Sequence, residues 1–451
     1  MTTQAARIGQ AAADASEAQV RSTDQARQGR NRGISTALSN PDYRIFFGGA
    51  MATNIGMWMQ NVAQGWLVVS LTSSEFYVGL VGFCAMIPTL FLSLFGGVLA
   101  DRFPKRLIIM PLQAIAFLQT ALLATLIATG RVELWHLMVI SAANGTVLAL
   151  NAPAFQAIVP EIVGKKVLRN AIALNSAQFN LTRIIGPSLG GLVIRYMGVA
   201  AAYYFNAVSY LALLVAMLFI RPKHEPAKRQ TSPDGVFRSL GAALRYVHGH
   251  SIIRPVLILA AVQTVFLFPY GTLLPVFAKN VLGLGASGYS LLLVSAGVGA
   301  LCGSLMLARR SGASGVRWML GAQVGFALST SVFAFSTNLW LSMAALVFVG
   351  WSLVTFMATG NTVVQSLVPD ELRGRVMSVW MLVGLGFIPI GSLQAGTVAA
   401  LVSPTFALVY GAVVTLICTA VVVSRNRVLL DPEVQPERDS FIVVRVFEPQ
   451  R

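Results

Sequence analysis

The sequence predicts an all-α integral membrane protein in which twelve transmembrane helices form two six-helix bundles. Hydrophobic residues make up 55% of the 451 residues and charged residues only 11%, whereas soluble domains carry about 25% charged residues. Apolar runs of roughly 20 residues, long enough to cross a ~30 Å hydrocarbon core, recur along the chain. Short segments of the second half also repeat segments of the first. A duplicated membrane-embedded half is typical of secondary transporters, because their substrate path forms between the halves.

The apolar runs divide into two sets of six with a polar segment between them. They lie near residues 45–70, 77–100, 107–129, 134–159, 172–194, 199–220, 253–278, 288–308, 318–336, 339–367, 376–400 and 403–424. The predicted organisation is a disordered cytoplasmic N-terminus (1–43), an N-terminal six-helix bundle (44–220), a cytoplasmic linker (221–252), a C-terminal six-helix bundle (253–424) and a cytoplasmic tail (425–451). The segment 1–43 contains no apolar core of the kind that a cleavable signal peptide needs.

The internal repeat is visible at two places. Gln156-Ala-Ile-Val-Pro-Glu161 is matched about 210 residues later by Gln365-Ser-Leu-Val-Pro-Asp370, and basic residues follow both. Gly97-Val-Leu-Ala-Asp-Arg102 is matched at nearly the same spacing by a segment that begins at Gly303 and ends in two arginines. Two matches in the same order indicate duplicated halves.

The net charge of +16 is explained by membrane topology. If both termini and every loop from an even to an odd span are cytoplasmic, 29 of the 33 lysines and arginines lie on that side. Arg131, Arg195 and Lys279 lie on the other side, and Arg183 lies inside a span. This is the positive-inside pattern, so it predicts a multi-pass protein of a bacterial inner membrane with both termini cytoplasmic, and no nucleic-acid partner.

The linker is predicted to contain an amphipathic helix. Residues 238–247 place apolar side chains at helical spacing beside basic ones, which is typical of a helix that lies along the inner membrane surface. A calmodulin-type target helix is the alternative reading of the same pattern.

A charged motif follows the second span: Gly97-Val-Leu-Ala-Asp101-Arg102-Phe-Pro-Lys105-Arg106. Gly97 would let two helices approach closely, and Asp101 would face the positive N-terminal end of a neighbouring helix. Arg102, Lys105 and Arg106 would pair with acids at adjacent helix ends. Such a clasp would hold the cytoplasmic side shut; an ordinary basic loop is the alternative.

The fifth span carries a second motif, Arg183-Ile-Ile-Gly186-Pro187-Ser-Leu-Gly190-Gly191. Gly186 and Gly190 form a small-residue face, and Pro187 would bend the helix where it meets its partner. We predict a conformational role for Gly186, Pro187 and Gly190, although static helix packing explains the glycines equally well.

These features together resemble the major facilitator superfamily. The six-plus-six spans and the motif from Gly97 to Arg106 are similar to its fold, and Gly186-Pro-x-x-Gly-Gly is similar to an element of its exporters. The sequence segment from Leu174 to Pro187 resembles the sequences of the branch that contains the enterobactin exporter and related siderophore and multidrug exporters. Over roughly residues 40–425, the resemblance implies proton-coupled export of a small amphiphilic molecule, siderophore or drug-like, by alternating access. An importer or a lipid flippase on the same fold is the alternative.

The sequence departs from this pattern where coupling is concerned. Pro104 stands where the motif usually has glycine, and Ser141 stands where many proton-driven exporters carry an arginine in the fourth span. All seventeen acids fall in termini, loops or span edges. A coupling proton would therefore bind Glu133 or Asp101 at a span edge, or travel on the substrate.

Arg183 is the one ionisable residue well inside a predicted span, which makes it a candidate for substrate binding. It would attract an anion such as a catecholate or a carboxylate; the alternative is an arginine that bonds backbone carbonyls. In the superfamily the first, fourth, seventh and tenth spans line the central cavity. Carried over to this chain, that adds Asn54, Asn61, Gln64, Asn144, Asn151, Gln263, Tyr270, Trp351 and Asn361.

No enzymatic constellation is apparent in the sequence. The four histidines have no cysteine or acidic partners at metal-ligand spacing, the three cysteines fall in separate spans, and no phosphate-binding Gly-x4-Gly-Lys motif occurs. We therefore expect no catalytic residues, metal or cofactor. The expected partners are a small-molecule substrate and membrane lipid, and the protein is expected to be a monomer.

Overall fold

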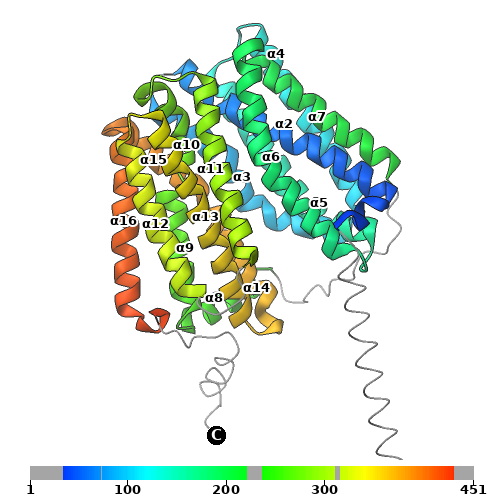
Figure 1. The fold of residues 1–451 in the computed structure, drawn as a ribbon. Coiled ribbons are helices and arrows are strands. Elements are labelled where there is room, and N and C mark those ends of the chain that lie inside the picture. The colour runs from blue at the N-terminus through cyan, green and yellow to red at the C-terminus, as the bar shows by residue number, and fades with distance from the viewer. Residues whose placement is uncertain (1–33, 73, 221–235, 310–314, 431–451) are drawn as a thin grey trace, which may run out of the picture.

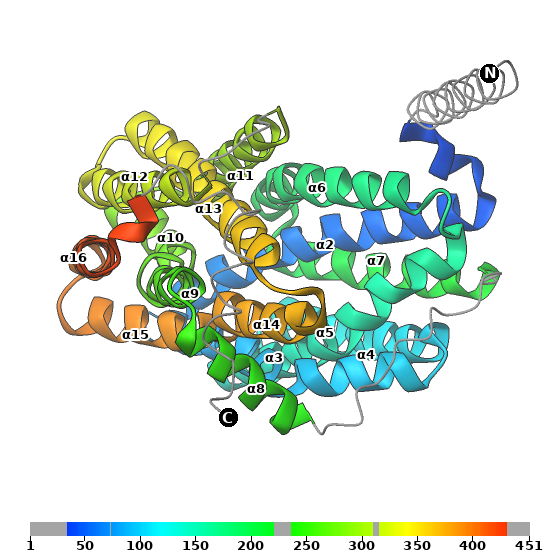
Figure 2. The same ribbon diagram turned by 90° about the horizontal axis from the view of Figure 1, so that it is seen from below.

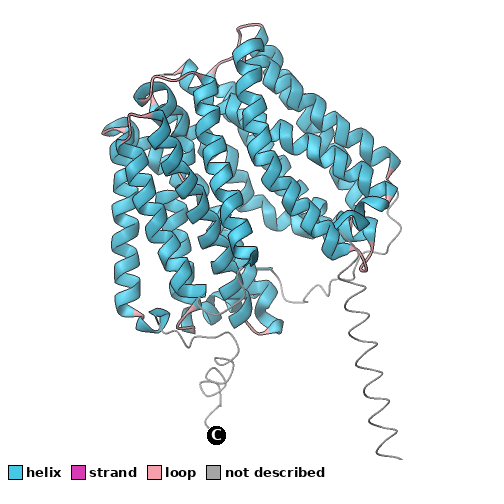
Figure 3. Cartoon of the chain, viewed as in Figure 1, coloured by secondary structure: helices cyan, strands magenta, loops and turns pink. Residues whose placement is uncertain are grey.

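The computed structural model describes residues 34–72, 74–220, 236–309 and 315–430. These residues are helical with short connections, and they contain no strand (Figure 3). The predicted disorder of 1–43 is wrong at its end, because residues 34–39 form a 3-10 turn and the first long helix begins at Pro41. Residues 1–33, most of the tail and the first part of the linker, 221–235, lie outside the described residues.

The N-terminal half follows the predicted spans. After the turn η1 (Ile34–Ser39) come α2 (Pro41–Leu71), α3 (Glu75–Arg102), α4 (Lys105–Ala128), α5 (Leu134–Val163), α6 (Leu168–Met197) and α7 (Val199–Phe219). The helix ends have local causes. The Asn40 side chain accepts hydrogen bonds from two backbone N–H groups of the first turn of α2. Gly164 and Gly198 end α5 and α6 with φ of 72° and 85°, a conformation that favours glycine.

The C-terminal half contains helices that are interrupted within the membrane. Its elements are α8 (Val236–Gly249), α9 (Ile253–Val262), η2 (Gln263–Leu267), α10 (Tyr270–Val276), η3 (Phe277–Val281), α11 (Ala286–Arg309), α12 (Gly315–Phe335), α13 (Leu339–Leu367), α14 (Asp370–Met381), η4 (Leu382–Gly386), α15 (Ile388–Leu401), α16 (Pro404–Arg425) and η5 (Arg427–Leu430). The seventh predicted span runs from α9 to η3. Its helix is interrupted at Phe268 and Pro269. Proline has no N–H to donate, and the N–H of Phe268 bonds to the Gln263 carbonyl in a π turn.

Ten described helical segments are long and apolar enough to cross a membrane. The helices α2 and α6 have 31 and 30 residues, which is long enough, but they are more polar than the others. In α6 the polarity comes from side chains such as Gln178, Asn180 and Arg183. The ten segments are recognised by their hydropathy. The helices α2 and α6 count as the remaining two predicted spans because of their length and their position in the fold.

The helices form two bundles that lie side by side (Figures 1 and 2). Within the N-terminal half, α2 packs against α6 and α7, and α3 packs against α5. Within the C-terminal half, α13 packs against both α11 and α12. Between the halves, α3 meets α15 and α6 meets α11. The two halves are thus joined along two helix pairs.

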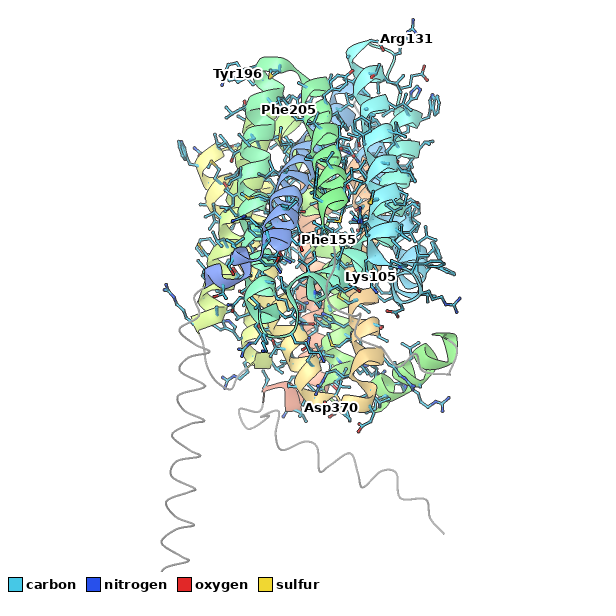
Figure 4. All side chains as sticks on the ribbon, turned by 90° about the vertical axis from the view of Figure 1, so that its right-hand side faces the viewer. Lys105, Arg131, Phe155, Tyr196, Phe205 and Asp370 are labelled. Atoms are coloured by element: carbon cyan, nitrogen blue, oxygen red, sulfur yellow. The ribbon has the colours of Figure 1, made fainter. Side chains whose placement is uncertain are left out.

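The two ends of the molecule differ. Lys105 and Asp370 lie near one end, which we call the basic end, and Arg131 and Tyr196 lie near the other, which we call the far end (Figure 4). At the far end, a single apolar core contains residues of both halves, such as Leu67 and Tyr203 with Leu273 and Tyr289. Toward the basic end, each half has its own core, and the bundles diverge (Figure 1).

The linker helix α8 covers the segment predicted to be amphipathic. Its buried residues Ala243 and Val247 belong to the core of the C-terminal half, against α9 and α14. The apolar face that was predicted to lie on the membrane is therefore at least partly covered by protein. The apolar residues Val376, Val379 and Trp380 of α14 belong to the same core and supply that cover.

Candidate substrate site between the two halves

Arg183 lies halfway along α6, where this helix packs on α2. Its side chain is half-buried, and its Cζ atom lies 5.8 Å from the centre of the Trp58 ring, which is within the range of a cation–π contact. Phe179, one turn before Arg183, also packs against Trp58, with its ring centroid 6.2 Å from that of Trp58. Gly186 makes the arrangement possible, because a Cβ atom there would collide with the Cβ of Trp58.

Tyr270 brings the C-terminal half to the same place. Its ring is 6% exposed and packs edge-to-face on Phe326 of α12, with centroids 5.8 Å apart. Its hydroxyl lies near enough to the Arg183 guanidinium to interact with that charge. Arg183, Trp58 and Tyr270 therefore form a small cluster across the boundary between the halves, which we call the Arg183 cluster.

No carboxylate is recorded in an ion pair with Arg183 among the described residues. Ion pairs elsewhere include Lys105 with Glu161, 2.8 Å apart, and Arg373 with Asp370, 2.6 Å apart. Every described acid lies at a helix end, as the sequence predicts. Arg183 is therefore a membrane-embedded cation without an opposite charge beside it.

Among the other predicted site residues of the N-terminal half, two form hydrogen bonds within that half. The Gln64 amide donates to the Ser141 hydroxyl at 3.1 Å, so the residue that replaces the expected arginine ties α5 to α2. Asn144 accepts from Gln119 of α4. Asn54 is half-buried and Asn61 is exposed. The Oδ1 atom of Asn151 is buried without a hydrogen-bond partner. The structure does not bring these five residues into the Arg183 cluster.

The predicted residues of the C-terminal half also have varied surroundings. Gln263 is fully buried at the start of η2, and neither amide atom has a partner. The Trp351 ring packs edge-to-face on Trp318 at 5.8 Å. Asn361 is half-buried and follows Gly360, which packs against Trp380. Of this set only Tyr270 joins the Arg183 cluster, and substrate contact by the others stays a prediction.

The motif after the second span differs in detail from the prediction. A Cβ atom on Gly97 would meet nothing within 4 Å, so Gly97 makes no close approach in this conformation. The close approach belongs to Gly96, where a Cβ would collide with the Ala149 carbonyl of α5. Gly97 lies one residue further along α3, which turns its Cα about 100° around the helix axis. The prediction for Gly97 is therefore wrong for this state.

Two basic residues of that motif bind different groups: Lys105 binds a carboxylate, and Arg106 binds backbone carbonyls. Lys105 pairs with Glu161 at the end of α5, as predicted for an acid at an adjacent helix end. Arg106 instead donates to the carbonyls of Leu218 and Ile220, at 3.1 and 3.4 Å, where the negative end of α7 substitutes for an acid. Asp101 and Arg102 are exposed.

The fifth-span motif contacts two helices at once. A Cβ on Gly190 would lie 3.1 Å from the Met59 Cα, so Gly186 and Gly190 both face α2, and Pro187 is buried between them. A Cβ on Gly191 would collide with Ser290 of α11, in the other half. The motif thus packs α6 within its own half and against the partner half.

Polar contacts at the far end were not predicted from the sequence. The Lys279 ammonium of η3 donates to the Val69 carbonyl in the last turn of α2 at 2.6 Å, where the helix dipole favours a cation. The neighbouring Asn280 donates to Glu75 of α3 at 3.4 Å. Both contacts join the two halves, and no local sequence pattern signals them because each pair is more than 200 residues apart.

We expect Lys279→Met to weaken the closed far end, because methionine keeps the length of the side chain but cannot donate to the Val69 carbonyl. The effect should be about 1 kcal/mol, roughly fivefold in the population of the far-end-open state, since the site is exposed. The measurement is thiol labelling of Ser290→Cys, a buried reporter at the far end, in a cysteine-free background. Lys279→Arg should label at the original rate; equal labelling of all variants would contradict the role of Lys279.

A family model described as transmembrane secretion effector, of the major facilitator type, matches residues 34–440. The chain belongs to this family. It is therefore a multi-pass membrane transporter, and not a member of an enzyme family.

This transporter is similar in sequence to three bacterial transporters. The staphyloferrin A transporter of Staphylococcus aureus is 24% identical over 78% of this chain and 87% of its own. The multidrug efflux pump Tap of Mycolicibacterium fortuitum is 26% identical over 78% and 87%. The enterobactin exporter EntS of Citrobacter koseri is 27% identical over 79% and 82%. The resemblance to siderophore and multidrug exporters is thereby confirmed.

Solved structures confirm the fold of the transporter. The nucleoside transporter NupG superimposes with a TM-score of 0.68, at 14% identity, over 85% of this chain and 98% of its own. A bacterial homologue of the human lysosomal transporter Spinster, in an inward-facing and unoccupied conformation, gives a TM-score of 0.65 at 14% identity over 88% and 98%. At these identities the likeness concerns the fold alone.

Proposed function

We propose that this transporter is a secondary active exporter of a small amphiphilic molecule, siderophore or drug-like, that works as a monomer by alternating access across a bacterial inner membrane. The observation that carries the proposal is the one-sided contact between its halves. At the far end they share one apolar core and the Lys279 and Asn280 contacts. At the basic end each half has a core of its own.

The basic end is assigned to the cytoplasm by the positive-inside pattern of the sequence. With that orientation the conformation is closed toward the outside and ready to accept a substrate from the cytoplasm. The substrate would contact residues where the halves meet at mid-depth, beside Arg183 and Tyr270. A swing of the halves about this level would then close the basic end and open the far end.

Export is favoured over import by the relatives and by the fifth span. Two of the three relatives named above are an exporter and an efflux pump, and Gly186-Pro187-x-x-Gly190 resembles an exporter element. An importer or a lipid flippase remains the second candidate, since the same two-half geometry serves either direction.

Coupling to a proton gradient is part of the proposal, with an edge carboxylate or the substrate as the proton carrier. The described acids lie at helix ends, and Glu75 is the one that contacts the opposite half. Glu75 therefore joins Asp101 and Glu133 as a candidate proton site, which the sequence pattern alone did not suggest.

The test is uptake into everted membrane vesicles energised by a proton gradient. Everted vesicles expose the cytoplasmic face, so an exporter fills them. A labelled catecholate siderophore and a lipophilic cationic dye should be compared with and without a protonophore. Protonophore-sensitive uptake of either compound supports proton-coupled export. Filling of right-side-out vesicles instead would establish an importer.

The predicted clasp at the basic end is tested by Asp101→Asn. We expect lower turnover with normal membrane insertion, because the loss of charge removes the attraction of Asp101 for a helix N-terminus in the state in which the basic end is closed. Everted vesicles with matched protein content measure the effect. Glu371→Gln, an exposed acid of α14, serves as control, and unchanged turnover in Asp101→Asn would remove the clasp from the mechanism.

A further inference from the structure

We propose that the Arg183 cluster is a binding site for a planar aromatic anion, and that the bound anion takes the place of Tyr270 at the Arg183 guanidinium. The inference deepens the proposed function by naming the charge and shape of the ligand. It rests on that function only for the consequence that ligand binding changes a contact between the halves.

Arg183 and Trp58 carry more hydrogen-bond donors than their surroundings have acceptors. Arg183 has five N–H donors and no acceptor, and neither a carboxylate nor a backbone carbonyl is recorded as its hydrogen-bond partner among the described residues. The indole Nε1 of Trp58 is buried and also lacks a partner. An indole N–H can only donate. Apart from the Tyr270 hydroxyl, the described residues offer these two adjacent groups no oxygen acceptor, and an acceptor-rich ligand would satisfy both.

The positive charge of Arg183 also favours an anionic ligand. An arginine inside a membrane-spanning helix is costly unless an opposite charge or a set of acceptors compensates it. The cation–π contact with Trp58 supplies only part of that compensation. An anionic ligand would supply the rest, whereas a cationic ligand would add a like charge. The cluster therefore selects against the lipophilic cations that many multidrug pumps carry.

The aromatic rings beside Arg183 favour a flat ligand. The rings of Trp58 and Phe179 lie 6.2 Å apart between centroids at an angle of 60°, and Trp58 is only half-buried. A flat ring can pack against Trp58 while its carboxylate or phenolate oxygens accept from the guanidinium in its own plane. A bulky aliphatic anion would gain the charge interaction but not the ring contact.

Tyr270 connects ligand binding to the halves. It belongs to α10 of the C-terminal half, whereas Arg183 and Trp58 belong to the N-terminal half. The backbone of Arg183 is also at the boundary, since a Cβ on Gly297 of α11 would lie 3.2 Å from its carbonyl oxygen. An anion is a better acceptor for a guanidinium than a phenol is. Its arrival would therefore displace the Tyr270 hydroxyl and remove one contact that holds the halves together at mid-depth.

The experiment uses three ligands of one size on the purified full-length transporter in lipid nanodiscs: benzoate, benzamide and benzylamine. Equilibrium binding of each is measured by competition against radiolabelled benzoate. We expect benzoate to bind at least tenfold more tightly than benzamide, and benzylamine not to compete, because charge-assisted hydrogen bonds are the strong ones. Equal binding of the three, or preference for benzylamine, would overturn the proposal.

Variants separate the roles of the three residues. Arg183→Gln should weaken benzoate at least tenfold and Arg183→Lys less. Trp58→Phe, which keeps a ring but removes the N–H donor, should weaken it about twofold to tenfold. Tyr270→Phe should strengthen it, because the competing hydroxyl is gone. Arg195→Gln is the matched control, since Arg195 is exposed and makes a similar contact at 5.6 Å with Tyr196, which lies at the far end (Figure 4).

The outcomes distinguish this inference from the proposed function. If Arg183→Gln does not fold, the opposite effects expected for Trp58→Phe and Tyr270→Phe still decide the matter. Energised export of a cationic dye without benzoate binding would keep the exporter and overturn the anion site. Selective benzoate binding without any vesicle transport would keep the site and overturn the proposed function.

Discussion

Replacing Gly79 with leucine should abolish transport while leaving both halves folded. Gly79 lies near the far end of α3, where it crosses α15 of the other half. A Cβ there would lie 2.5 Å from the Ser392 carbonyl and 2.8 Å from the Gly396 Cα. These are backbone atoms that no side-chain rotation can move away, so the halves would have to separate at the far end.

The consequence is specific to one state of the transporter. A leucine at this crossing excludes the conformation in which the far end is closed, and alternating access requires that conformation in each cycle. Thiol labelling of Ser290→Cys should therefore become fast from the outer side, and vesicle transport should fall to background. The smaller Gly79→Ala change should give a partial effect in the same direction.

The matched control is Gly48→Leu, because Gly48 has no neighbour within 4 Å of its Cβ position and is exposed on α2. It should transport at the original rate. Normal transport by Gly79→Leu would contradict the assignment of this crossing as a closure that must form and open. Loss of folded protein, seen as aggregation on gel filtration, would mean that the crossing is needed for assembly as well.

The second large effect is expected at Gly350, and it concerns stability. Gly350 of α13 and Gly299 of α11 face each other's helices: a Cβ on Gly350 would collide with the Ala296 carbonyl, and one on Gly299 would collide with the Val347 carbonyl. This is the small-residue packing by which membrane helices approach closely. The contact lies within the C-terminal half, so it should be independent of the transport state.

We expect Gly350→Ala to destabilise the C-terminal half by about 1–3 kcal/mol or more, the usual range for overpacking a well-packed site. For a bundle of this size, each kcal/mol corresponds to roughly 2–4 °C in Tm. Thermal unfolding of the purified protein measures the change. Gly321→Ala on α12 is the control, since its Cβ would meet nothing within 4 Å; equal Tm values for the two variants would contradict the close crossing.

The hydrophobic pattern predicted nearly every helix. The predicted spans 134–159 and 339–367 became α5 and α13, with ends within a few residues of the prediction. The reason is that the bilayer demands a minimum apolar length and satisfied backbone hydrogen bonds. The linker between the halves was visible for the same reason, since a proline-rich basic segment cannot cross a bilayer.

The candidate site was predictable only in part. Arg183 was recognisable because a charge inside an apolar segment costs free energy whichever way the helix is rotated. Its neighbours did not, because hydropathy carries little information about the rotation of a helix within a bundle. Gly96 rather than Gly97 makes the close contact on α3, and Asn144 bonds to Gln119 inside its own half. A shift of one residue, about 100° on a helix, separates these alternatives.

The sequence by itself predicted a polytopic transporter of two halves, the approximate bounds of its helices and Arg183 as a candidate site residue, because these depend on composition and on distance along one helix. Only the tertiary structure decided that Trp58 and Tyr270 lie beside Arg183, that Lys279 and Asn280 join the halves at the far end, and that the described residues share one core there but form separate cores toward the basic end. Those contacts join residues far apart in the chain, and their free energy depends on how rigid helices are rotated and tilted against one another.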